Sequence, residues 1–146
     1  FTADDGVHGR ELWVSDGTPA GTFLVKDIHA SPMELGPSGL VEYGGRVYFA
    51  ADDGVHGREL WRSDGTEAGT AMVKEIDPGT GSRPSSLTES GGALLFTADD
   101  GTHGDELWRS DGTAAGTTKP SNCSATTGGT GCVWRTPAGA SCGSMR

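Results

Sequence analysis

The stretch FAADDGVHGRELWRSDGTEAGT at residues 49–70 occurs three times in the chain with few changes. Residues 1–22 read FTADDGVHGRELWVSDGTPAGT and match it at 19 of 22 positions. Residues 96–117 read FTADDGTHGDELWRSDGTAAGT and match it at 18 of 22 positions. The copies begin 48 and then 47 residues apart. A repeat of this length is typical of stacked structural units, each of which buries apolar faces against its neighbours.

The repeat divides the 146 residues into four segments. We take 1–48 as the first repeat or blade, 49–95 as the second, 96–117 as a partial third and 118–146 as a tail that is not repeat. The tail has no acidic residue, is rich in Ser, Thr and Gly, and holds all three cysteines, Cys123, Cys132 and Cys142. Their spacing fits no zinc motif, so one disulfide with a free thiol and three free thiols are both open. A β-like stretch at 132–135 would either complete the third unit or belong to a disordered tail.

Within one period the pattern predicts four short strands and no helix. The segments 46–51, 59–63, 70–76 and 85–90 are bounded by Gly-Gly, Asp-Gly or Pro-Gly turns. Apolar residues fall on both faces of a strand, as with Leu60 beside Trp61, which suits a small sheet packed between two neighbours. We therefore predict an all-β fold, a β-propeller-like array of four-stranded blades with about 2.5 to 3 blades per chain. A β-sandwich or prism is the alternative.

Closure of such an array needs more blades than the chain encodes, because propellers typically have about four to eight. An open array would leave apolar faces and strand edges exposed. We therefore expect a homo-oligomer, such as a dimer that closes a five- or six-bladed ring. The other reading is a piece of a longer repeat protein, and Phe1 at the first position indicates a mature form or a fragment.

The composition restricts the partners of the chain. With 25 glycines and 7 prolines among 146 residues the chain is rich in turns, and its net charge is −9. Such acidity argues against nucleic acid and anionic membrane surfaces and favours cations. No apolar run approaches the roughly 20 residues of a membrane helix, so we expect no membrane insertion.

The loop DDGVHGRE at residues 4–11 recurs at 52–59 and, as DDGTHGDE, at 99–106. It places two carboxylates, an imidazole and a third carboxylate within eight residues, and acidic loops with glycine suit Ca²⁺, our expected ion. The histidine would permit Zn²⁺ or Mn²⁺ instead. The alternative is structural, with Asp-Gly forming the turn and the histidine capping a carbonyl. The predicted metal ligands are Asp4, Asp5, Glu11, Asp52, Asp53, Glu59, Asp99, Asp100 and Glu106.

Two further features of the repeat are interpreted as structural. The Ser-Asp-Gly-Thr sequences at 15–18, 63–66 and 110–113 resemble the Asp-box turn of several propeller families, in which the aspartate and the hydroxyls hold a hairpin turn rigid. Trp13, Trp61 and Trp108 are predicted to be core residues that join neighbouring blades rather than platforms that stack on sugars.

The stretches ELWVSDGTPAGT, ELWRSDGTEAGT and ELWRSDGTAAGT resemble the ELWxxDGT repeat family of bacterial exported repeat proteins. The resemblance covers residues 1–117. It implies a blade-like repeat and an exported origin, and therefore an extracellular or cell-surface location. It implies no activity.

Three functions are compatible with these patterns. The first is a Ca²⁺-stabilised binding or surface module, with a small molecule or saccharide as its ligand. The second is a Ca²⁺-dependent hydrolase of cyclic esters, such as sugar lactones or acyl-homoserine lactones, by analogy with gluconolactonase-type propellers. The third is an inactive fragment of a longer repeat protein. Three equal loops favour the first, because an enzyme normally has one asymmetric site. The general base of the hydrolase would be His56 with Asp53, or their copies His8 with Asp5 and His103 with Asp100.

Overall fold

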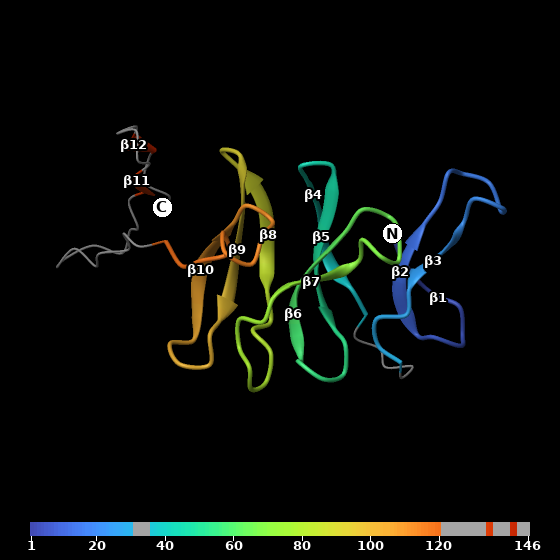
Figure 1. Cartoon of the computed structure of the whole chain (residues 1–146), viewed down its shortest axis with the longest axis horizontal. Helices are drawn as coiled ribbons and strands as arrows, with labels where there is room; N and C mark the ends of the chain where they lie inside the picture. Colours follow the sequence, from blue (N-terminus) through green and yellow to red (C-terminus); the bar gives the residue numbers. More distant parts are fainter. Residues whose placement is uncertain (31–35, 121–133, 136–140, 143–146) are drawn as a thin grey trace.

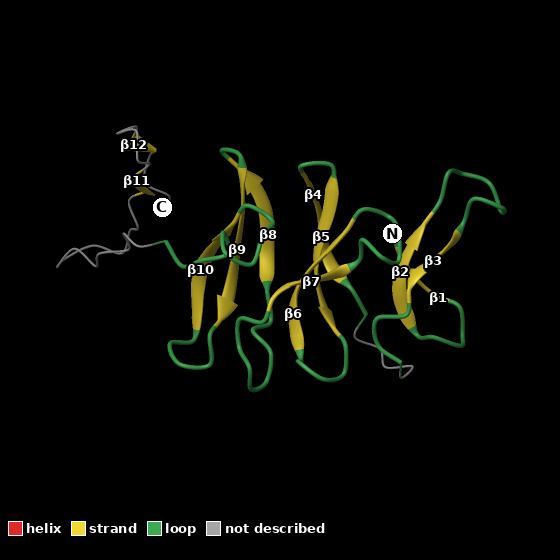
Figure 2. Cartoon of the chain, in the orientation of Figure 1, coloured by secondary structure: helices red, strands yellow, loops and turns green. Residues whose placement is uncertain are grey.

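The computed structural model describes residues 1–30, 36–120, 134–135 and 141–142. These residues form strands and turns with no helix (Figure 2). Three small antiparallel sheets of three, four and three strands lie in a row along the long axis of the molecule (Figure 1). The predicted all-β fold is confirmed. In the described part of the chain there is accordingly no helix that could span a membrane.

Strands that are consecutive in the sequence pair with one another in each sheet. Sheet 1 contains β1 (Thr2–Asp4), β2 (Arg10–Val14) and β3 (Phe23–Lys26). Sheet 2 contains β4 (Ser38–Tyr43), β5 (Arg46–Asp52), β6 (Arg58–Ser63) and β7 (Ala71–Lys74). Sheet 3 contains β8 (Ser85–Ser90), β9 (Ala93–Asp99) and β10 (Asp105–Ser110).

The sheets are offset from the sequence repeats. The boundary between the repeats 1–48 and 49–95 falls inside β5, so sheet 2 takes its first strand from the end of one repeat and most of its other strands from the next. By repeat position, β1 to β3 are the counterparts of β5 to β7, and β8 to β10 are the counterparts of β4 to β6. In sheet 3 the place of β7 is marked by a single bridge between Arg109 and Thr118.

Strand lengths agree closely with the sequence pattern except at β7. The segments predicted at 46–51, 59–63 and 85–90 correspond to β5, β6 and β8, to within one residue at each end. The segment predicted at 70–76 is paired only over Ala71–Lys74. It ends early because the chain turns inward there, which buries Ile76 and directs the backbone NH of Asp77 to Glu59.

The tail forms a separate pair of short strands, β11 (Trp134–Arg135) and β12 (Ser141–Cys142). β11 therefore does not complete sheet 3, whose strands are β8 to β10. Cys123 and Cys132 lie outside the described residues, so the predicted alternatives for the thiols stay open.

The core consists of two apolar clusters, one on each face of sheet 2. In β5, Tyr48 joins the cluster shared with sheet 3, whereas Phe49 and Ala51 join the cluster shared with sheet 1. Leu60 and Trp61 of β6 divide in the same way, because successive side chains of a strand point to opposite faces. Sheet 2 is thus packed between its neighbours, as the sequence pattern predicts.

The burial of each repeat tryptophan depends on whether a neighbouring sheet covers it. Trp61 and Trp108 are each 6% exposed and belong to the two clusters, which confirms their predicted core role. Trp13, at the same repeat position in sheet 1, is partly exposed. In the described part of the chain no sheet packs against the face to which Trp13 belongs.

Each Ser-Asp-Gly-Thr turn is closed by its own side chains. In the turn after β6, Asp64 Oδ1 accepts hydrogen bonds from the backbone NH and the hydroxyl of Thr66, at 3.0 and 2.6 Å. The Thr66 hydroxyl oxygen accepts the NH of Gly69 at 3.0 Å. The turns at Asp16 and Asp111 have the same bonds. The predicted structural role of this motif is confirmed.

Candidate functional site: the DDGxHG loops

The three DDGxHG loops are the β1–β2, β5–β6 and β9–β10 connections. Each occupies the same position in its sheet, and all three lie along the lower side of the row in Figure 1. Whatever one loop presents to the solvent is therefore presented three times along one side of the molecule.

The carboxylates of each loop hold the turn itself. In the second loop, Asp52 Oδ1 accepts the NH of Gly54 at 2.7 Å, and Asp53 Oδ1 accepts the NH groups of Val55 and His56 at 2.9 and 2.8 Å. Gly54 has a φ of 79°, a conformation that favours glycine. The first and third loops contain the same bonds. The Asp-Gly turn predicted as the structural alternative is present.

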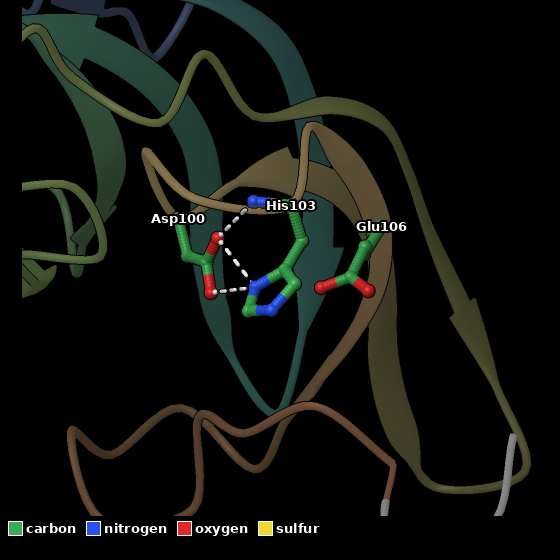
Figure 3. A group of neighbouring side chains, drawn as sticks. All are labelled: Asp100, His103 and Glu106. Carbon is green, nitrogen blue, oxygen red and sulfur yellow. Dashed lines mark hydrogen bonds and ion pairs between the residues drawn. The ribbon is translucent and has the colours of Figure 1, made fainter.

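The histidine of each loop pairs with a carboxylate, and in this respect the structural alternative is corrected. His56 Nδ1 lies 2.7 Å from Asp53 Oδ2, and His8 Nδ1 lies 2.7 Å from Asp5 Oδ2, so neither ring caps a carbonyl through this nitrogen. In the third loop His103 Nδ1 lies 3.1 Å from Asp100 Oδ2 (Figure 3). The hydrogen bond that each ring donates to its aspartate carboxylate raises the pKa of His8 and of His56. Because Nδ1 faces the carboxylate, Nε2 is the nitrogen left for a proton or a metal ion.

Two of the glutamates predicted as ligands are core residues. Glu11 and Glu59 are 2% and 0% exposed. Glu59 Oε1 accepts the NH of Asp77 at 2.9 Å, and its Oε2 accepts the Ser82 hydroxyl at 2.5 Å. Glu11 Oε1 accepts the NH of His29 in the same manner, at 2.9 Å. Burial raises the pKa of both carboxyl groups. These glutamates therefore hold the connection that follows β3 or β7 and lie apart from the loop aspartates.

The third glutamate joins its loop. Asp100, His103 and Glu106 each offer a ligand atom, and these atoms lie within 4.8 Å of one another (Figure 3). Within the described ranges this is the one group of three or more such side chains close enough to hold a metal ion. Of the nine predicted ligands, then, the structure brings Asp100 and Glu106 together, and it adds His103. Asp4, Asp52 and Asp99 instead cap the NH of the following glycine.

Lys119 places a positive charge in this group. Its Nζ donates a hydrogen bond to Asp100 Oδ2 at 2.5 Å, forms an ion pair with Glu106, and lies 3.3 Å from His103 Nδ1. Lys119 lowers the pKa of Asp100, and the two carboxylates raise the pKa of Lys119. Position 119 is the counterpart of Leu24 and Met72 in the other repeats. The sequence reasoning missed this residue, although its signal was visible as a lysine two residues past the last repeat copy.

Two grooves lie away from the loop histidines, at the contact between sheets 1 and 2. One is lined by Thr2, Arg10, Leu40 and Arg58 with residues 36–39. The other is apolar, and its lining includes Phe1, Val14, Leu40, Val47 and Gly65. None of the loop histidines lines either groove.

No family model, curated protein or solved structure matches this chain. Its function is therefore inferred from the geometry of its own residues.

Proposed function

We propose that the chain is a non-catalytic β-propeller-type binding module, related to the ELWxxDGT repeat proteins, that binds divalent cations at its DDGxHG loops. The observation that carries the proposal is the repeated pairing of a loop histidine with an aspartate, which fixes the imidazole in each loop. A histidine oriented by a carboxylate on one ring nitrogen is a common arrangement in metal sites. The net charge of −9 favours the approach of cations to the molecule.

The propeller arrangement is supported by the way in which the sheets pack. Sheet 2 buries both faces, and its first strand β4 contacts β8, the first strand of sheet 3. β7 reaches sheet 3 through the long Lys74 side chain, which lies over the Trp108 ring of β10 and donates to the Thr117 carbonyl at 2.7 Å. Among the described strands the backbones of β7 and β10 make no approach comparable to that of β4 and β8. Sheets that converge at their first strands and separate at their last strands resemble the blades of a propeller around an axis. An exported origin, implied by the family resemblance, is part of this proposal.

The donors favour a transition-metal ion over Ca²⁺. Ca²⁺ takes six to eight oxygen ligands, but the loop aspartates already accept backbone NH groups, and Glu11 and Glu59 are buried elsewhere. The remaining combination of an imidazole and carboxylates in the third loop suits Zn²⁺ or Mn²⁺. In the folded chain Lys119 supplies the positive charge of this group, so an incoming ion has to displace the ammonium.

The hydrolase alternative has no comparable observation in its favour. His56 with Asp53 has the pairing that a general base requires. Both described grooves, however, are lined by other residues. Neither of these two grooves therefore offers a lactone a paired histidine.

The test is cation binding by the full chain and by the Lys119→Met variant. Because zinc also binds thiolates, both proteins carry Cys123→Ser, Cys132→Ser and Cys142→Ser. We expect Lys119→Met to bind Zn²⁺ and Mn²⁺ about tenfold more tightly than the parent, because removing a competing charge a few Å away is worth about 1.4 kcal/mol or more. Isothermal titration calorimetry measures the affinity, and Mn²⁺ broadening of the His103 ring signals in NMR locates the ion.

The matched control adds His103→Ala to the Lys119→Met protein, which should return the affinity to the parent value or below. Two results would count against the proposal. One is that neither protein binds Zn²⁺ or Mn²⁺, and the other is that Ca²⁺ binds more tightly than either and is unaffected by His103→Ala.

A further inference from the structure

At the contact between sheets 2 and 3, the β4–β5 hairpin of sheet 2 is held against sheet 3. Tyr43 and Tyr48 of the β4–β5 hairpin fill the space between the two sheets, with their rings 5.8 Å apart. The Tyr43 hydroxyl donates to the carbonyl of Gly92 at 2.8 Å. Tyr48 is 3% exposed, and its hydroxyl oxygen would lie only 2.1 Å from a Cβ built on Gly112. The hydroxyl therefore fills the space beside this glycine.

The contact between sheets 1 and 2 has no such hairpin, because no described strand of sheet 1 is the counterpart of β4. Gly65 is the counterpart of Gly112, and a Cβ placed on it would meet no atom within 4 Å. The apolar groove lies at this point, with Val14, Leu40 and Val47 in its wall. Phe1, at its edge, is 54% exposed, whereas its counterpart Phe49 is fully buried. The groove therefore has the location at the contact of sheets 1 and 2 that Tyr48 fills at the contact of sheets 2 and 3.

Strand edges are also free at this groove. In sheet 2, Val47 and Tyr48 pair with Ser63 and Arg62, and Ser38 pairs with Ala50. The counterparts in sheet 1 of Ser63, Arg62 and Ala50 are Ser15, Val14 and Thr2. Val14 pairs with Phe23 on its other side, and Thr2 pairs with Leu12. In the described structure no strand pairs with the open sides of these residues, so their backbone groups can accept one.

Arg10 lies beside this free edge of sheet 1. In sheet 2 the Arg58 guanidinium donates to the Ser38 hydroxyl at 2.5 Å, to the Gly36 carbonyl at 3.1 Å and to the Ala50 carbonyl at 2.9 Å, and so ties β4 to β5. Arg10 is the counterpart of Arg58, and it lines the polar groove together with Thr2. Within the described ranges the structure gives its guanidinium no hydrogen bond.

We propose that the grooves and free edges of sheet 1 form an acceptor site for a β-hairpin with the sequence pattern of residues 36–48. The second tyrosine of the hairpin fills the apolar groove over Gly65, its returning strand pairs with Val14 and Ser15, and Arg10 ties down its first strand. The bound hairpin continues the packing that already joins sheets 2 and 3. This inference does not rest on cation binding.

The first test uses a synthetic peptide with the sequence of residues 36–48, GPSGLVEYGGRVY. NMR titration into the full chain should shift the amide signals of Val14, Ser15 and Gly65 in a saturable way. A control peptide with Tyr48→Asp should not bind, because its carboxylate would have to enter an apolar groove. Arg10→Ala in the chain should weaken binding about tenfold, as expected for a charge-assisted hydrogen bond.

A second test removes the cost of bringing two molecules together. Residues 36–48 are joined directly ahead of Phe1, where the repeat places them, with the Tyr48→Asp version as the matched control. The tyrosine version should melt about 5 °C or more above the control and should resist proteolysis in the added segment.

Equal melting temperatures and equal cleavage of the two fused proteins would overturn the inference. The fusion holds the hairpin beside the groove, so weak affinity of a free peptide would not explain that result. The inference would also fail if the chain alone forms a dimer that Arg10→Ala dissociates and the peptide does not displace. That result would show that a second folded copy occupies the groove.

Discussion

One glutamate position has two environments in this chain. Glu59 and Glu106 sit in the same ELW motif, yet Glu59 is fully buried, whereas the Glu106 side chain is 38% exposed. The difference arises from the segment that follows. After β7 the chain brings the NH of Asp77 and the hydroxyl of Ser82 to Glu59, but after Thr117 the sequence departs from the repeat, and Lys119 becomes the partner of Glu106.

We expect Glu59→Ala to reduce the free energy of unfolding by about 2–4 kcal/mol, because it leaves buried NH and hydroxyl donors without an acceptor. Glu106→Ala, the matched control, should cost less than about 1 kcal/mol, as expected for a partly exposed ion pair. Urea denaturation at pH 7 measures both. Equal losses for the two variants would show that Glu59 does not act through these hydrogen bonds.

The raised pKa of Glu59 determines in which direction its contribution to the free energy of unfolding changes with pH. Since burial raises its pKa in the folded state, the folded protein holds this proton more tightly than the unfolded chain does. The contribution of this group to stability is complete below the unfolded pKa and is lost as pH rises through the folded pKa. Glu59→Gln should therefore flatten the fall in stability over that pH range, whereas Glu106→Gln should leave the part due to Glu59 in place.

At the scale of the element, the Ser-Asp-Gly-Thr turns leave no room for a side chain at the second glycine. A Cβ on Gly69 would lie 2.0 Å from Asp64 Oδ1, and Gly21 and Gly116 are equally close to their own aspartates. The Asp64 carboxylate cannot move away without losing the hydrogen bonds from Thr66. The turn thus requires both residues of the Asp-x-x-x-x-Gly pair.

We expect Gly69→Ala to destabilise the chain by about 2 kcal/mol, because the clash displaces a carboxylate that holds the turn. In an Asp64→Ala background the same change should cost less than about 0.5 kcal/mol, since the clashing atoms are gone. A double-mutant cycle by thermal or urea unfolding gives the coupling. Additive losses would contradict the crowding between these two residues.

The elements were largely predictable from the sequence, because strands such as β5 and β8 follow directly from apolar patterns bounded by glycine turns. The sheet boundaries were not, since a repeating sequence does not show where within its period a sheet begins. The site was predicted in part. Asp100 and Glu106 were named as ligands, but the burial of Glu59 depends on contacts with Asp77 and Ser82, which are 18 and 23 residues away. Local sequence carries no information on such contacts.

At the scale of the whole molecule, the row of sheets ends in an incomplete apolar face. Ala3, Trp13 and Leu24 of sheet 1 are the counterparts of Ala51, Trp61 and Met72, which pack against the preceding sheet. In the described structure no sheet packs against Ala3, Trp13 and Leu24. A second copy that covers this face is the simplest form of the association predicted from the open array.

We expect light scattering to give a mass that is a multiple of 15.0 kDa and rises with concentration. Leu24→Asp should lower that mass toward the monomer, because a charge would enter the covered face. Val7→Asp is the control, since Val7 is a loop residue that is 70% exposed. A folded monomer at all concentrations would contradict association through this face.

The offset between sheets and repeats has a consequence for how such a chain changes in length. Because sheets 2 and 3 each take strands from two repeats, removing or inserting one period of 47 or 48 residues joins strands that already fit one another, wherever within the period the cut falls. No special junction is required. The number of sheets can therefore change by unequal recombination between nearly identical copies, with each product folding by the same contacts as its parent.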